Sequence, residues 1–459
     1  MAENRNDLPE DGRSRLTADA STGRAAIVVP VLSRQFRTDD DEDASRPRLV
    51  RSAQARLEEA VGLARAIDLT PVVTEIVNVS DPRPATLLGS GKVKDLADSV
   101  AEKALELLIV DHPLTPVQQR NLEKETKAKV LDRTGLILEI FGRRARTKEG
   151  SRQVELAHLS YQKGRLVRSW THLERQRGGA GFLGGPGETQ IESDRRILQD
   201  KIVKLRGEIR EVERTRDLHR RQRKKAQYPV VAVVGYTNAG KSTLFNRLTG
   251  AGVLSEDMLF ATLDPTLRRV KLPHGATAIF SDTVGFISNL PTHLVAAFRA
   301  TLEEVVEADL IVHLRDISDP DTAAQAADVE QILHDLGVET GPSSRVLEVW
   351  NKVDLIDAQT RERLLEENAS VGQGRPTTIS AITGEGVGDL LSVVEQRLGG
   401  DIRRVTVTIA PAQLSQLDWI YSRASVSGRK DNEDGSVTLT VEGPESSITE
   451  LGRRLRKAG

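Results

Sequence analysis

A glycine-rich turn between a short apolar segment and a helix constrains this chain more than any other feature. The apolar segment runs from Tyr228 to Val234 and predicts a buried strand. A phosphate-binding loop fits the residues that follow, which read Gly235-Tyr236-Thr237-Asn238-Ala239-Gly240-Lys241-Ser242, and Thr243 continues into the required helix. The N–H groups of such a loop and the helix N-terminus attract anions. We therefore expect Lys241 to reach the β- and γ-phosphates of a nucleotide and the Ser242 hydroxyl to ligate Mg²⁺.

The ends of two later strands predict which base the nucleotide carries. A strand over residues 346–350 is followed by Asn351-Lys352-Val353-Asp354. The Asp354 carboxylate can accept from the N1–H and the exocyclic amine of guanine, whereas adenine has no donor at N1. Further on, Ser380-Ala381-Ile382 places the Ala381 N–H where it could meet guanine O6, while the contribution of Ile382 stays open. We predict GTP as the ligand and residues 229–399 as a GTPase domain.

Two segments between these motifs are predicted to respond to the γ-phosphate. A strand ending at Phe280 precedes Asp282-Thr283-Val284-Gly285, which has the spacing of a carboxylate behind the Mg²⁺ shell and a glycine N–H that senses the γ-phosphate. The first switch is predicted over Phe260-Ala261-Thr262-Leu263-Asp264-Pro265-Thr266. Its threonine would ligate Mg²⁺ in the triphosphate state and release it after hydrolysis. On chemistry alone, Thr262 and Thr266 are both candidates.

Three further regions flank this domain. Residues 1–24 are polar and predict a disordered tail. Residues 25–141 alternate between strands and helices, which predicts an α/β domain with a largely parallel sheet. The expected strands are 26–29, 72–79 and 107–110, the expected helices are 48–67, 92–104 and one from Thr115, and 135–141 closes the series. Residues 400–459 predict a small α+β domain, with strands at 405–409 and 436–441 and helices after Pro411 and Pro444.

Residues 142–228 predict a basic antiparallel helical hairpin. Each arm carries a narrow apolar seam with the spacing of a coiled coil, and a glycine-rich tip lies between them at 178–187. The seams consist of Leu156, Leu159, Leu166, Trp170 and Leu173 on one arm, and of Leu198, Ile202, Leu205, Ile209 and Val212 on the other. We expect arms of about 25 to 30 residues. The alternative is a linker hairpin that packs on its own domain.

The charge is unevenly distributed along the chain. The formal net charge is −2, which by itself indicates no polyanionic partner. From Arg143 to Arg177 there are ten Lys/Arg against three Asp/Glu, and from Arg195 to Lys225 thirteen against five. These windows carry +7 and +8, so the rest carries −17. Two solvated helix surfaces would explain either window alone, but two basic windows that flank one loop favour nucleic-acid phosphates as a partner.

The composition limits the chemistry and the compartment. The chain has 459 residues and no cysteine, so disulfides, thiolate metal sites and a cysteine nucleophile are excluded. A reducing cytoplasm suits such a composition. The longest aliphatic runs, such as 26–29 and 230–234, are far shorter than the roughly 18 residues of a membrane span. We expect a cytoplasmic protein with no membrane span.

Several of these strings closely resemble the HflX family of translational GTPases. The resemblance rests on residues 235–243, 260–266 and 282–287, and on Arg-Pro-Ala-Thr at 83–86, Gly-Ser-Gly-Lys at 89–92 and Gly-Gly-Pro-Gly-Glu-Thr-Gln at 184–190. It covers about residues 25–399. The resemblance implies a protein that binds the large ribosomal subunit and splits stalled or idle ribosomes, with its N-terminal domain reaching toward the peptidyl-transferase centre. It also favours Thr262 as the Mg²⁺ ligand.

The residues expected to take part in hydrolysis are Lys241, Thr262, Gly285 and Asn238. Phe286 stands where many GTPases carry a water-orienting glutamine, so we expect slow intrinsic hydrolysis until the ribosome orders the switches. Asn238 has two interpretations. It ligates a monovalent cation such as K⁺, as the matching asparagine does in some related GTPases that lack the glutamine, or its side chain stabilises the turn.

We therefore expect a GTPase, monomeric off the ribosome, that contacts the 50S subunit and its rRNA through the hairpin. GTP binding would split the 70S ribosome, and hydrolysis would release the factor. Two alternatives stay open: an assembly GTPase that acts on precursor 50S particles, and an RNA-remodelling protein whose N-terminal domain hydrolyses ATP. Residues 89–92 lack the spacing of a second phosphate loop, and a strand-to-helix turn is the favoured interpretation there.

Overall fold

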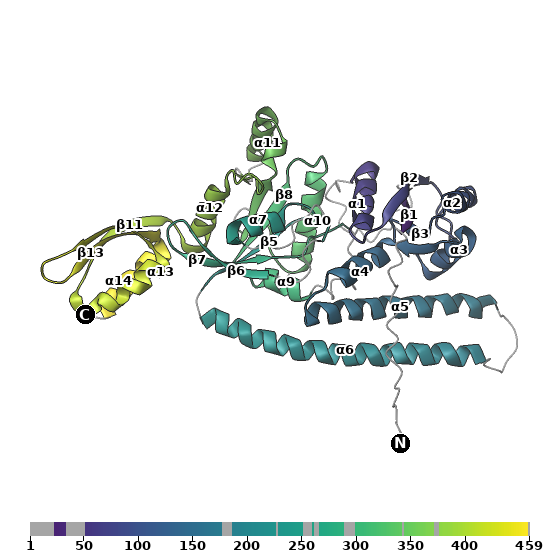
Figure 1. Ribbon diagram of the computed structural model, residues 1–459, viewed down its shortest axis with the longest axis horizontal. Coiled ribbons are helices and arrows are strands. Elements are labelled where there is room, and N and C mark those ends of the chain that lie inside the picture. The colour runs from purple at the N-terminus through teal and green to yellow at the C-terminus, as the bar shows by residue number, and fades with distance from the viewer. Residues whose placement is uncertain are drawn as a thin grey trace, which may run out of the picture.

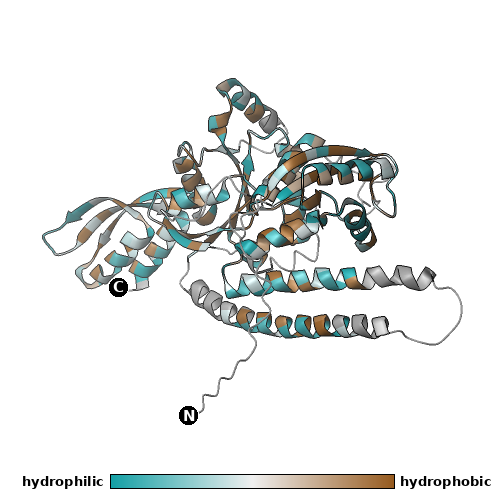
Figure 2. Cartoon of the chain, turned by 45° about the vertical axis from the view of Figure 1, so that its right-hand side comes forward, coloured by the Kyte–Doolittle hydropathy of each residue, from teal (hydrophilic) through white to brown (hydrophobic). Residues whose placement is uncertain are grey.

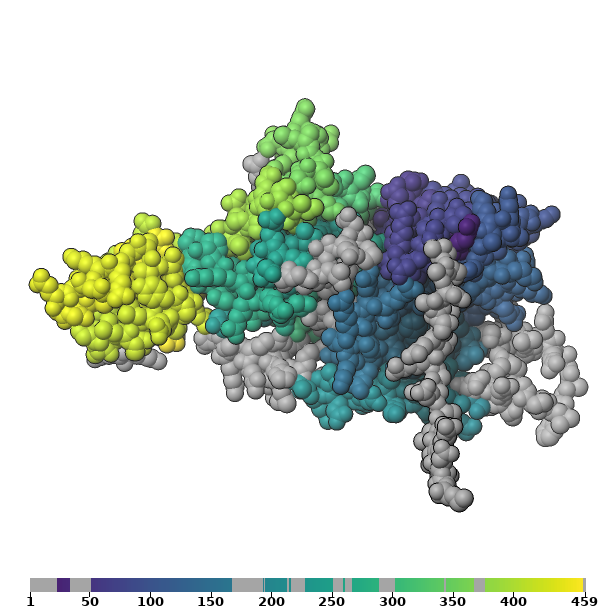
Figure 3. Space-filling view, in the orientation of Figure 1, coloured from purple at the N-terminus to yellow at the C-terminus, as the bar shows by residue number. Residues whose placement is uncertain are grey.

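The computed structural model describes residues 23–33, 51–176, 186–225, 228–250, 259–260, 266–288, 299–341, 344–370 and 376–457. The predicted tail at 1–22, most of the glycine-rich tip and the first switch at 261–265 lie outside the described residues. Figure 3 shows the N-terminal domain at one end of the molecule, the GTPase domain in the middle and the C-terminal module at the other end. The boundaries that we assign to these domains stay a prediction.

A four-stranded parallel sheet forms the centre of the N-terminal domain, as predicted. Its order is β2-β1-β3-β4, with β1 (Arg24–Leu32), β2 (Thr70–Val79), β3 (Leu107–Val110) and β4 (Lys129–Asp132). Helices pack beside it: α1 (Ala53–Arg65), α2 (Ser90–Glu102), α3 (Pro116–Thr126) and α4 (Arg133–Arg144). The central strand β1 is buried over most of its length, because helices cover both faces of a parallel sheet.

The end of this domain differs from the prediction. Residues 135–141 belong to helix α4, and the strand that pairs with β3 is β4, which was not expected. The Asp132 side chain caps α4 by accepting from the Gly135 N–H at 2.8 Å. Residues 133–138 and 140–141 of α4 are all buried. Glu139 is the one exposed residue of the segment 135–141, so this nearly continuous apolar run resembles a strand of the core.

The predicted hairpin consists of α5 (Lys148–Gln176) and α6 (Pro186–Lys225). Figure 1 shows the two helices side by side beneath the N-terminal domain, with α6 continuing beneath the GTPase domain. Leu159, Ile202, Leu205 and Ile209 of the predicted seam are buried. The second arm is longer than expected, and α6 includes Pro186 and Gly187, because proline is well suited to a first helical turn. No helix of the described residues is long and apolar enough to cross a membrane.

The GTPase domain contains a six-stranded sheet in the order β10-β9-β8-β5-β7-β6. Only β6 pairs with its neighbour in the antiparallel direction. The strands are β5 (Val230–Val234), β6 (Thr266–Lys271), β7 (Thr277–Asp282), β8 (Leu310–Asp316), β9 (Val346–Asn351) and β10 (Thr377–Thr378). The helices are α7 (Lys241–Thr249), α9 (Arg299–Val306), α10 (Thr322–Asp335), α11 (Ala358–Ser370) and α12 (Val387–Gly399), with the short 3₁₀ helix η3 (Val353–Leu355).

The topology of this sheet positions the predicted motifs. Strands β5, β7, β8, β9 and β10 run parallel, so their carboxyl ends meet at one edge, where ligands of α/β proteins bind. Three of the predicted motifs follow these ends directly, at residues 235, 283 and 352, and a fourth follows β10 closely at residue 380. The strand that we expected to end at Phe280 continues to Asp282.

A single hydrophobic core continues from the N-terminal domain into the GTPase domain. It includes Ile27 and Leu63 of the first and Phe286 and Ile287 of the second. Figure 2 shows hydrophobic residues concentrated at the centre of both domains, whereas the hairpin alternates between polar and apolar residues. The two domains are therefore joined by core packing as well as by the chain.

The C-terminal module has the predicted α+β character. Its antiparallel sheet has the order β11-β13-β12, with β11 (Ile402–Ile409), β12 (Ser425–Asp431) and β13 (Val437–Pro444). The 3₁₀ helix η4 (Pro411–Gln416) and the helices α13 (Leu417–Arg423) and α14 (Glu445–Lys457) complete it. Sequence analysis missed β12, because this edge strand is short, polar and largely exposed.

Candidate nucleotide site and its contacts with the N-terminal domain

The phosphate loop has the tight backbone that its glycines predict. A Cβ atom on Gly235, where φ is +153°, would lie 2.2 Å from the Leu314 carbonyl oxygen. Gly240 has φ +91°, and its Cβ would lie 2.2 Å from the Asn351 side-chain nitrogen. Asn238 is exposed and has φ +61°, a backbone conformation that asparagine tolerates better than most residues. This explains an asparagine at the turn, while the cation interpretation stays a prediction.

Lys241 and Ser242 open helix α7 beside the end of β7. The Lys241 amino group is buried and donates to the Tyr236 carbonyl at 2.6 Å. Burial lowers the pKa of Lys241 to about 8, although the Asp282 carboxylate opposes the shift. The Ser242 hydroxyl donates to Asp282 Oδ2 at 2.8 Å. Thr243 follows in the same helix and is half-buried.

The oxygen atoms of Ser242 and Asp282 fit a Mg²⁺ site. Mg²⁺ prefers hard oxygen ligands and usually keeps water and phosphate oxygens in its shell. No group of three or more His, Asp or Glu in the described part of the chain could hold a metal. An ion here would therefore depend on nucleotide oxygens and hydroxyls. The other predicted metal ligand, Thr262, lies outside the described residues, as do Ala261, Leu263 and Asp264.

The segment after β7 is attached to the phosphate loop by its backbone. The Phe286 N–H donates to the Gly235 carbonyl at 3.1 Å, and the Thr237 N–H donates to the Phe286 carbonyl at 2.8 Å. A Cβ on Gly285 would lie 2.9 Å from Thr237 Cγ2 and 3.2 Å from Lys241 Nζ, so only glycine fits there. Thr283 and Val284 are buried just before it. The Phe286 ring is also buried, in the core shared with the N-terminal domain, and cannot orient a water molecule.

The predicted base-binding residues gather at the ends of β9 and β10. Asn351 donates to the Ala239 carbonyl at 2.8 Å and accepts from the Ala381 N–H at 2.9 Å. Lys352 has φ +65°, and its amino group lies 2.7 Å from Asp316 Oδ2. Val353 is buried, whereas Asp354 is exposed. Ser380 is buried and Ile382 is 67% exposed. The Ala381 N–H, which we aimed at guanine O6, thus already has a partner that sequence analysis did not foresee.

Comparisons with known proteins identify the family. Four family models match successive parts of the chain: "GTP-binding GTPase N-terminal" over 54–142, "GTP-binding GTPase Middle Region" over 144–223, "50S ribosome-binding GTPase" over 230–352 and "HflX C-terminal domain" over 366–459. The GTPase HflX of Magnetococcus marinus is 48% identical over 418 residues, covering 91% of this chain and 94% of that protein. The chain belongs to the HflX family of GTPases. Its predicted enzymatic class, GTP hydrolysis, is confirmed with the family.

Other relatives agree with this assignment. The GTPase HflX of Escherichia coli is 44% identical over 364 residues, which cover 79% of this chain and 84% of that protein. The HflX C-terminal model also covers the C-terminal module, whose sequence was less diagnostic. Among solved structures, a GTP-binding protein from Sulfolobus solfataricus in complex with GDP has a TM-score of 0.42 and 23% identity. It covers 82% of this chain and 98% of that chain, a likeness from which nothing further follows.

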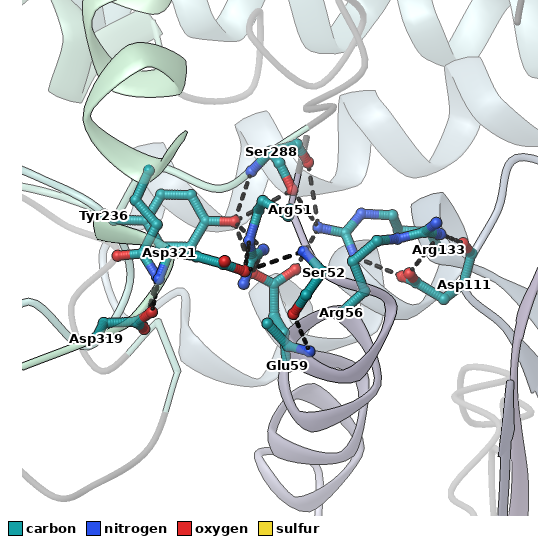
Figure 4. A network of polar contacts seen from close by, with 12 residues as sticks. Arg51, Ser52, Arg56, Glu59, Asp111, Arg133, Tyr236, Ser288, Asp319 and Asp321 are labelled. Atoms are coloured by element: carbon teal, nitrogen blue, oxygen red, sulfur yellow. Dashed lines mark hydrogen bonds and ion pairs between the residues drawn. The ribbon is translucent and has the colours of Figure 1, made fainter. Parts of the chain in front are cut away.

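Sequence analysis missed a buried polar network that joins the nucleotide site of this HflX-family protein to the N-terminal domain. The Tyr236 hydroxyl donates to Glu59 Oε2 at 2.6 Å and accepts from Arg51 Nη1 at 2.7 Å. The Ser288 N–H donates to the same hydroxyl at 3.0 Å. Figure 4 shows these side chains converging from α1, the phosphate loop and the segment after β7. The second residue of the phosphate loop therefore points its side chain into the domain interface.

Arg133 completes the network from the first residue of α4. It donates to Glu59 Oε1 at 2.6 Å, to the Ser288 carbonyl at 3.1 Å and to Asp111. Its side chain and that of Glu59 are each only 5% exposed. Burial alone would raise the pKa of Glu59, but the charges of Arg133 and Arg51 and the Tyr236 hydroxyl lower it overall. Glu59 is therefore ionised inside the interface at neutral pH.

The residue before Arg133 contacts the hairpin. Asp132 Oδ1 accepts from the Tyr161 hydroxyl at 2.6 Å, and Asp132 Oδ2 accepts from Arg165 at 2.6 Å. Both partners lie on α5. We call this pair of adjacent residues, Asp132 and Arg133, the α4 joint. It connects the nucleotide site on one side with the hairpin on the other.

The start of the first switch also packs on the N-terminal domain. The rings of Phe260 and Phe141 meet edge to face with their centroids 4.8 Å apart. A Cβ on Gly62 would lie 3.1 Å from the Leu259 side chain. Thr266, the second candidate Mg²⁺ ligand, is the first residue of β6 and lies opposite Asp282 in the sheet. A spacing pattern could not have revealed these contacts, because both partners are ordinary core residues far apart in sequence.

The ionised Glu59 makes stability depend on pH. Its folded pKa lies below the unfolded value of 4.5, so its contribution is complete above pH 4.5 and is lost as the pH falls through the folded pKa. Glu59→Gln should destabilise the protein by about 3 kcal/mol at pH 7 by leaving two buried cations with one carboxylate fewer. The difference in urea midpoint from the parent should shrink below about pH 4.5.

A surface glutamate provides the control for this experiment. Glu75 forms an ion pair with Lys92 but is 38% exposed, so Glu75→Gln should change stability by less than about 1 kcal/mol. If the difference in urea midpoint between Glu59→Gln and the parent is the same at pH 7 and at pH 3.5, the Glu59 carboxylate does not cause the pH dependence of stability.

Proposed function

We propose that this GTPase binds the 50S ribosomal subunit and splits 70S ribosomes, with GTP binding driving the splitting and hydrolysis driving release. The observation that carries the proposal is the α4 joint, where the basic hairpin binds Asp132, the N-cap of α4, and a residue near the nucleotide site binds Arg133, the first residue of α4. The family model that matches the GTPase domain is described as a 50S ribosome-binding GTPase, which supports the choice of partner. We place the working compartment in the cytoplasm and expect a monomer off the ribosome.

In this proposal the motif residues take the roles that their positions allow. The amides of the phosphate loop and the Lys241 amino group hold the phosphates, and Asp354 holds the guanine edge. Ser242 and Thr262 ligate Mg²⁺, with Asp282 behind Ser242. The ion neutralises charge on the phosphate oxygens when it is bound. The Gly285 N–H senses the γ-phosphate, since its position beside Lys241 leaves no room for a side chain.

In this proposal, fast hydrolysis requires a group from outside the chain to position the attacking water. Because the Phe286 ring packs in the interdomain core, residue 286 cannot position the attacking water, a task worth several powers of ten in rate. We assign that task to the ribosome-bound state, in which the first switch is ordered. Slow hydrolysis off the ribosome keeps the GTP state available until a target is found.

The α4 joint gives the nucleotide a route to the hairpin. A γ-phosphate acts on the backbone around Gly285 and on the first switch, and both segments continue directly into residues held by the N-terminal domain. The Ser288 carbonyl accepts a hydrogen bond from Arg133 of α4, and the Phe260 ring packs on Phe141 of α4. A shift of α4 would be passed to α5 through Asp132. A nucleotide-dependent change in the distance between the GTPase domain and the hairpin would test this route.

The hairpin surface suits a ribosomal RNA partner. Seven basic residues of α6 with described side chains are exposed, namely Arg195, Arg196, Lys201, Lys204, Arg206, Arg210 and Arg214. Ile197 and Val203 of the same helix are 50% and 58% exposed. Phosphate contacts would supply affinity that falls with salt, and the apolar side chains could contact riboses or bases.

Sedimentation of purified 70S ribosomes tests the proposal. GTP and a non-hydrolysable analogue should both produce free 50S and 30S subunits, and ATP should not. The protein should stay on the 50S peak with the analogue and leave it with GTP. Replacement of residues 178–187 by a short rigid turn should abolish splitting while nucleotide binding is kept. An absolute need for hydrolysis would contradict the proposal.

The same gradients separate the alternatives. An assembly GTPase would leave mature 70S particles intact and associate with precursor 50S particles. An RNA-remodelling ATPase would act with ATP. The loop at residues 89–92 of the N-terminal domain is poorly suited to bind the phosphates of ATP, because the Lys92 amino group forms an ion pair with Glu75 at 2.5 Å.

Monovalent cations test the role of Asn238. If its side chain ligates K⁺, single-turnover GTP hydrolysis should be several-fold faster in K⁺ than in Na⁺ at equal ionic strength. Asn238→Gly removes the amide but keeps the positive φ without strain, so it should abolish the K⁺ preference rather than unfold the loop. Equal rates of the parent in the two salts would leave Asn238 with the turn-stabilising role alone.

A further inference from the structure

Arg247 ties the helix of the phosphate loop to the loop expected to contact the guanine base. It lies on α7, the helix that Lys241 begins. Its Nε donates to the Ala381 carbonyl at 2.6 Å, and its Nη2 donates to the Ile382 carbonyl. Both acceptors belong to the main chain. Arg247 therefore controls the backbone path of the loop, whatever side chains stand at 381 and 382.

The loop has a glycine where Arg247 comes closest. Gly384 has φ +93°, and a Cβ there would lie 2.7 Å from Arg247 Nη1. A side chain would be strained by the backbone and would also displace the guanidinium group. The close approach of Arg247 and the positive φ thus explain why a glycine stands at position 384, just after the base motif.

Between Ser380 and Glu385, the Ile382 N–H is the backbone amide with no acceptor among the described residues. The Ala381 N–H donates to Asn351 Oδ1, the Thr383 N–H to the Ser380 hydroxyl and the Gly384 N–H to the Ser380 carbonyl. The Ile382 N–H takes part in none of the hydrogen bonds between described residues. It shares a planar trans peptide unit with the Ala381 carbonyl, so the two groups point in opposite directions. Because Arg247 holds that carbonyl, the Ile382 N–H is turned away from Arg247.

We infer that Arg247 is a positioning residue for guanine recognition, which fixes the 381–382 peptide so that the Ile382 N–H, beside that of Ala381, meets guanine O6. Guanine has an acceptor at C6, whereas adenine has an amine donor there, so a fixed N–H at this point rejects adenine. Arg247 does not touch the nucleotide itself. The inference rests on the base loop that we assign above and not on any ribosomal role.

A second arginine on the same loop offers a matched control. Arg361 of α11 donates to Glu385 Oε1 at 2.6 Å and to the Thr378 hydroxyl at 2.8 Å. It binds side chains at the two ends of the loop and neither of the carbonyls at 381 and 382. Arg361→Met therefore removes an arginine of the same neighbourhood without releasing the 381–382 peptide.

The experiment compares GDP with 2-aminopurine riboside 5′-diphosphate, which lacks the oxygen at C6 and the proton at N1. Calorimetric titration of the full chain gives both affinities, and circular dichroism reports the thermal midpoint. Arg247→Met should weaken GDP binding about tenfold, the effect of one lost hydrogen bond of this kind. It should weaken binding of the 2-aminopurine nucleotide by less than about twofold, because that base makes no bond at C6. Arg361→Met should leave the ratio of the two affinities as in the parent.

If Arg247→Met does not fold, Arg247→Lys replaces it in the same binding comparison. A single ammonium group cannot span two carbonyls as the planar guanidinium does, so Arg247→Lys should lose part of the discrimination. Equal loss for both nucleotides, or no loss, would overturn the inference, because a general supporting role affects both ligands alike. Failure of the parent to distinguish the two nucleotides would also overturn it, by showing that the base loop itself is wrongly assigned.

Discussion

The buried ion pair between Arg133 and Glu59 is the interaction on which the rest of this structure depends. Both side chains lie where the N-terminal domain meets the GTPase domain, and each is almost inaccessible to water. Burying either charge alone would cost several kcal/mol, so the two must stay together, and Asp111 and Arg51 complete their coordination. Both residues belong to the N-terminal domain, and the Tyr236 hydroxyl and the Ser288 carbonyl of the GTPase domain bind to the pair, so the two domains are held in one arrangement. Because Arg133 also binds Ser288 and follows Asp132, that arrangement fixes the hairpin relative to the nucleotide site.

This arrangement gives the phosphate loop two separate tasks. Its backbone is shaped by Gly235 and Gly240 to hold phosphates, while the Tyr236 side chain is buried in the domain interface. Phe286 also has two roles, since its backbone forms hydrogen bonds with the phosphate loop and its ring packs in the core shared by the two domains. A residue that contributes to the interdomain core cannot also activate water. The slow hydrolysis that we propose and the packing of the two domains thus both depend on the phenylalanine at position 286.

The sequence predicted the parts of the fold and site whose residues obey local rules. Phosphate-loop and base motifs lie next to strand ends as predicted, and the sheet of the GTPase domain brings these ends to one edge. The prediction failed where tertiary contacts replace local signals. Helix α4 resembles a strand because residues 135–141 are buried except for Glu139, and β12 is too polar to resemble one. The network of Glu59, Arg133 and Tyr236 left no pattern, because its members are spread over residues 51–288 and each is unremarkable alone.

A distance measurement between the GTPase domain and the hairpin tests the central claim most directly. The chain has no cysteine, so Lys201→Cys and Gln359→Cys, both at exposed positions, place two spin labels uniquely on α6 and α11. The coupling proposed here predicts that a non-hydrolysable GTP analogue shifts the distance distribution relative to GDP. It also predicts that Tyr236→Phe, saturated with the same nucleotides, greatly reduces that shift, whereas Tyr421→Phe at an exposed site does not. A shift of equal size in the Tyr236→Phe protein, or no shift in the parent, would contradict it.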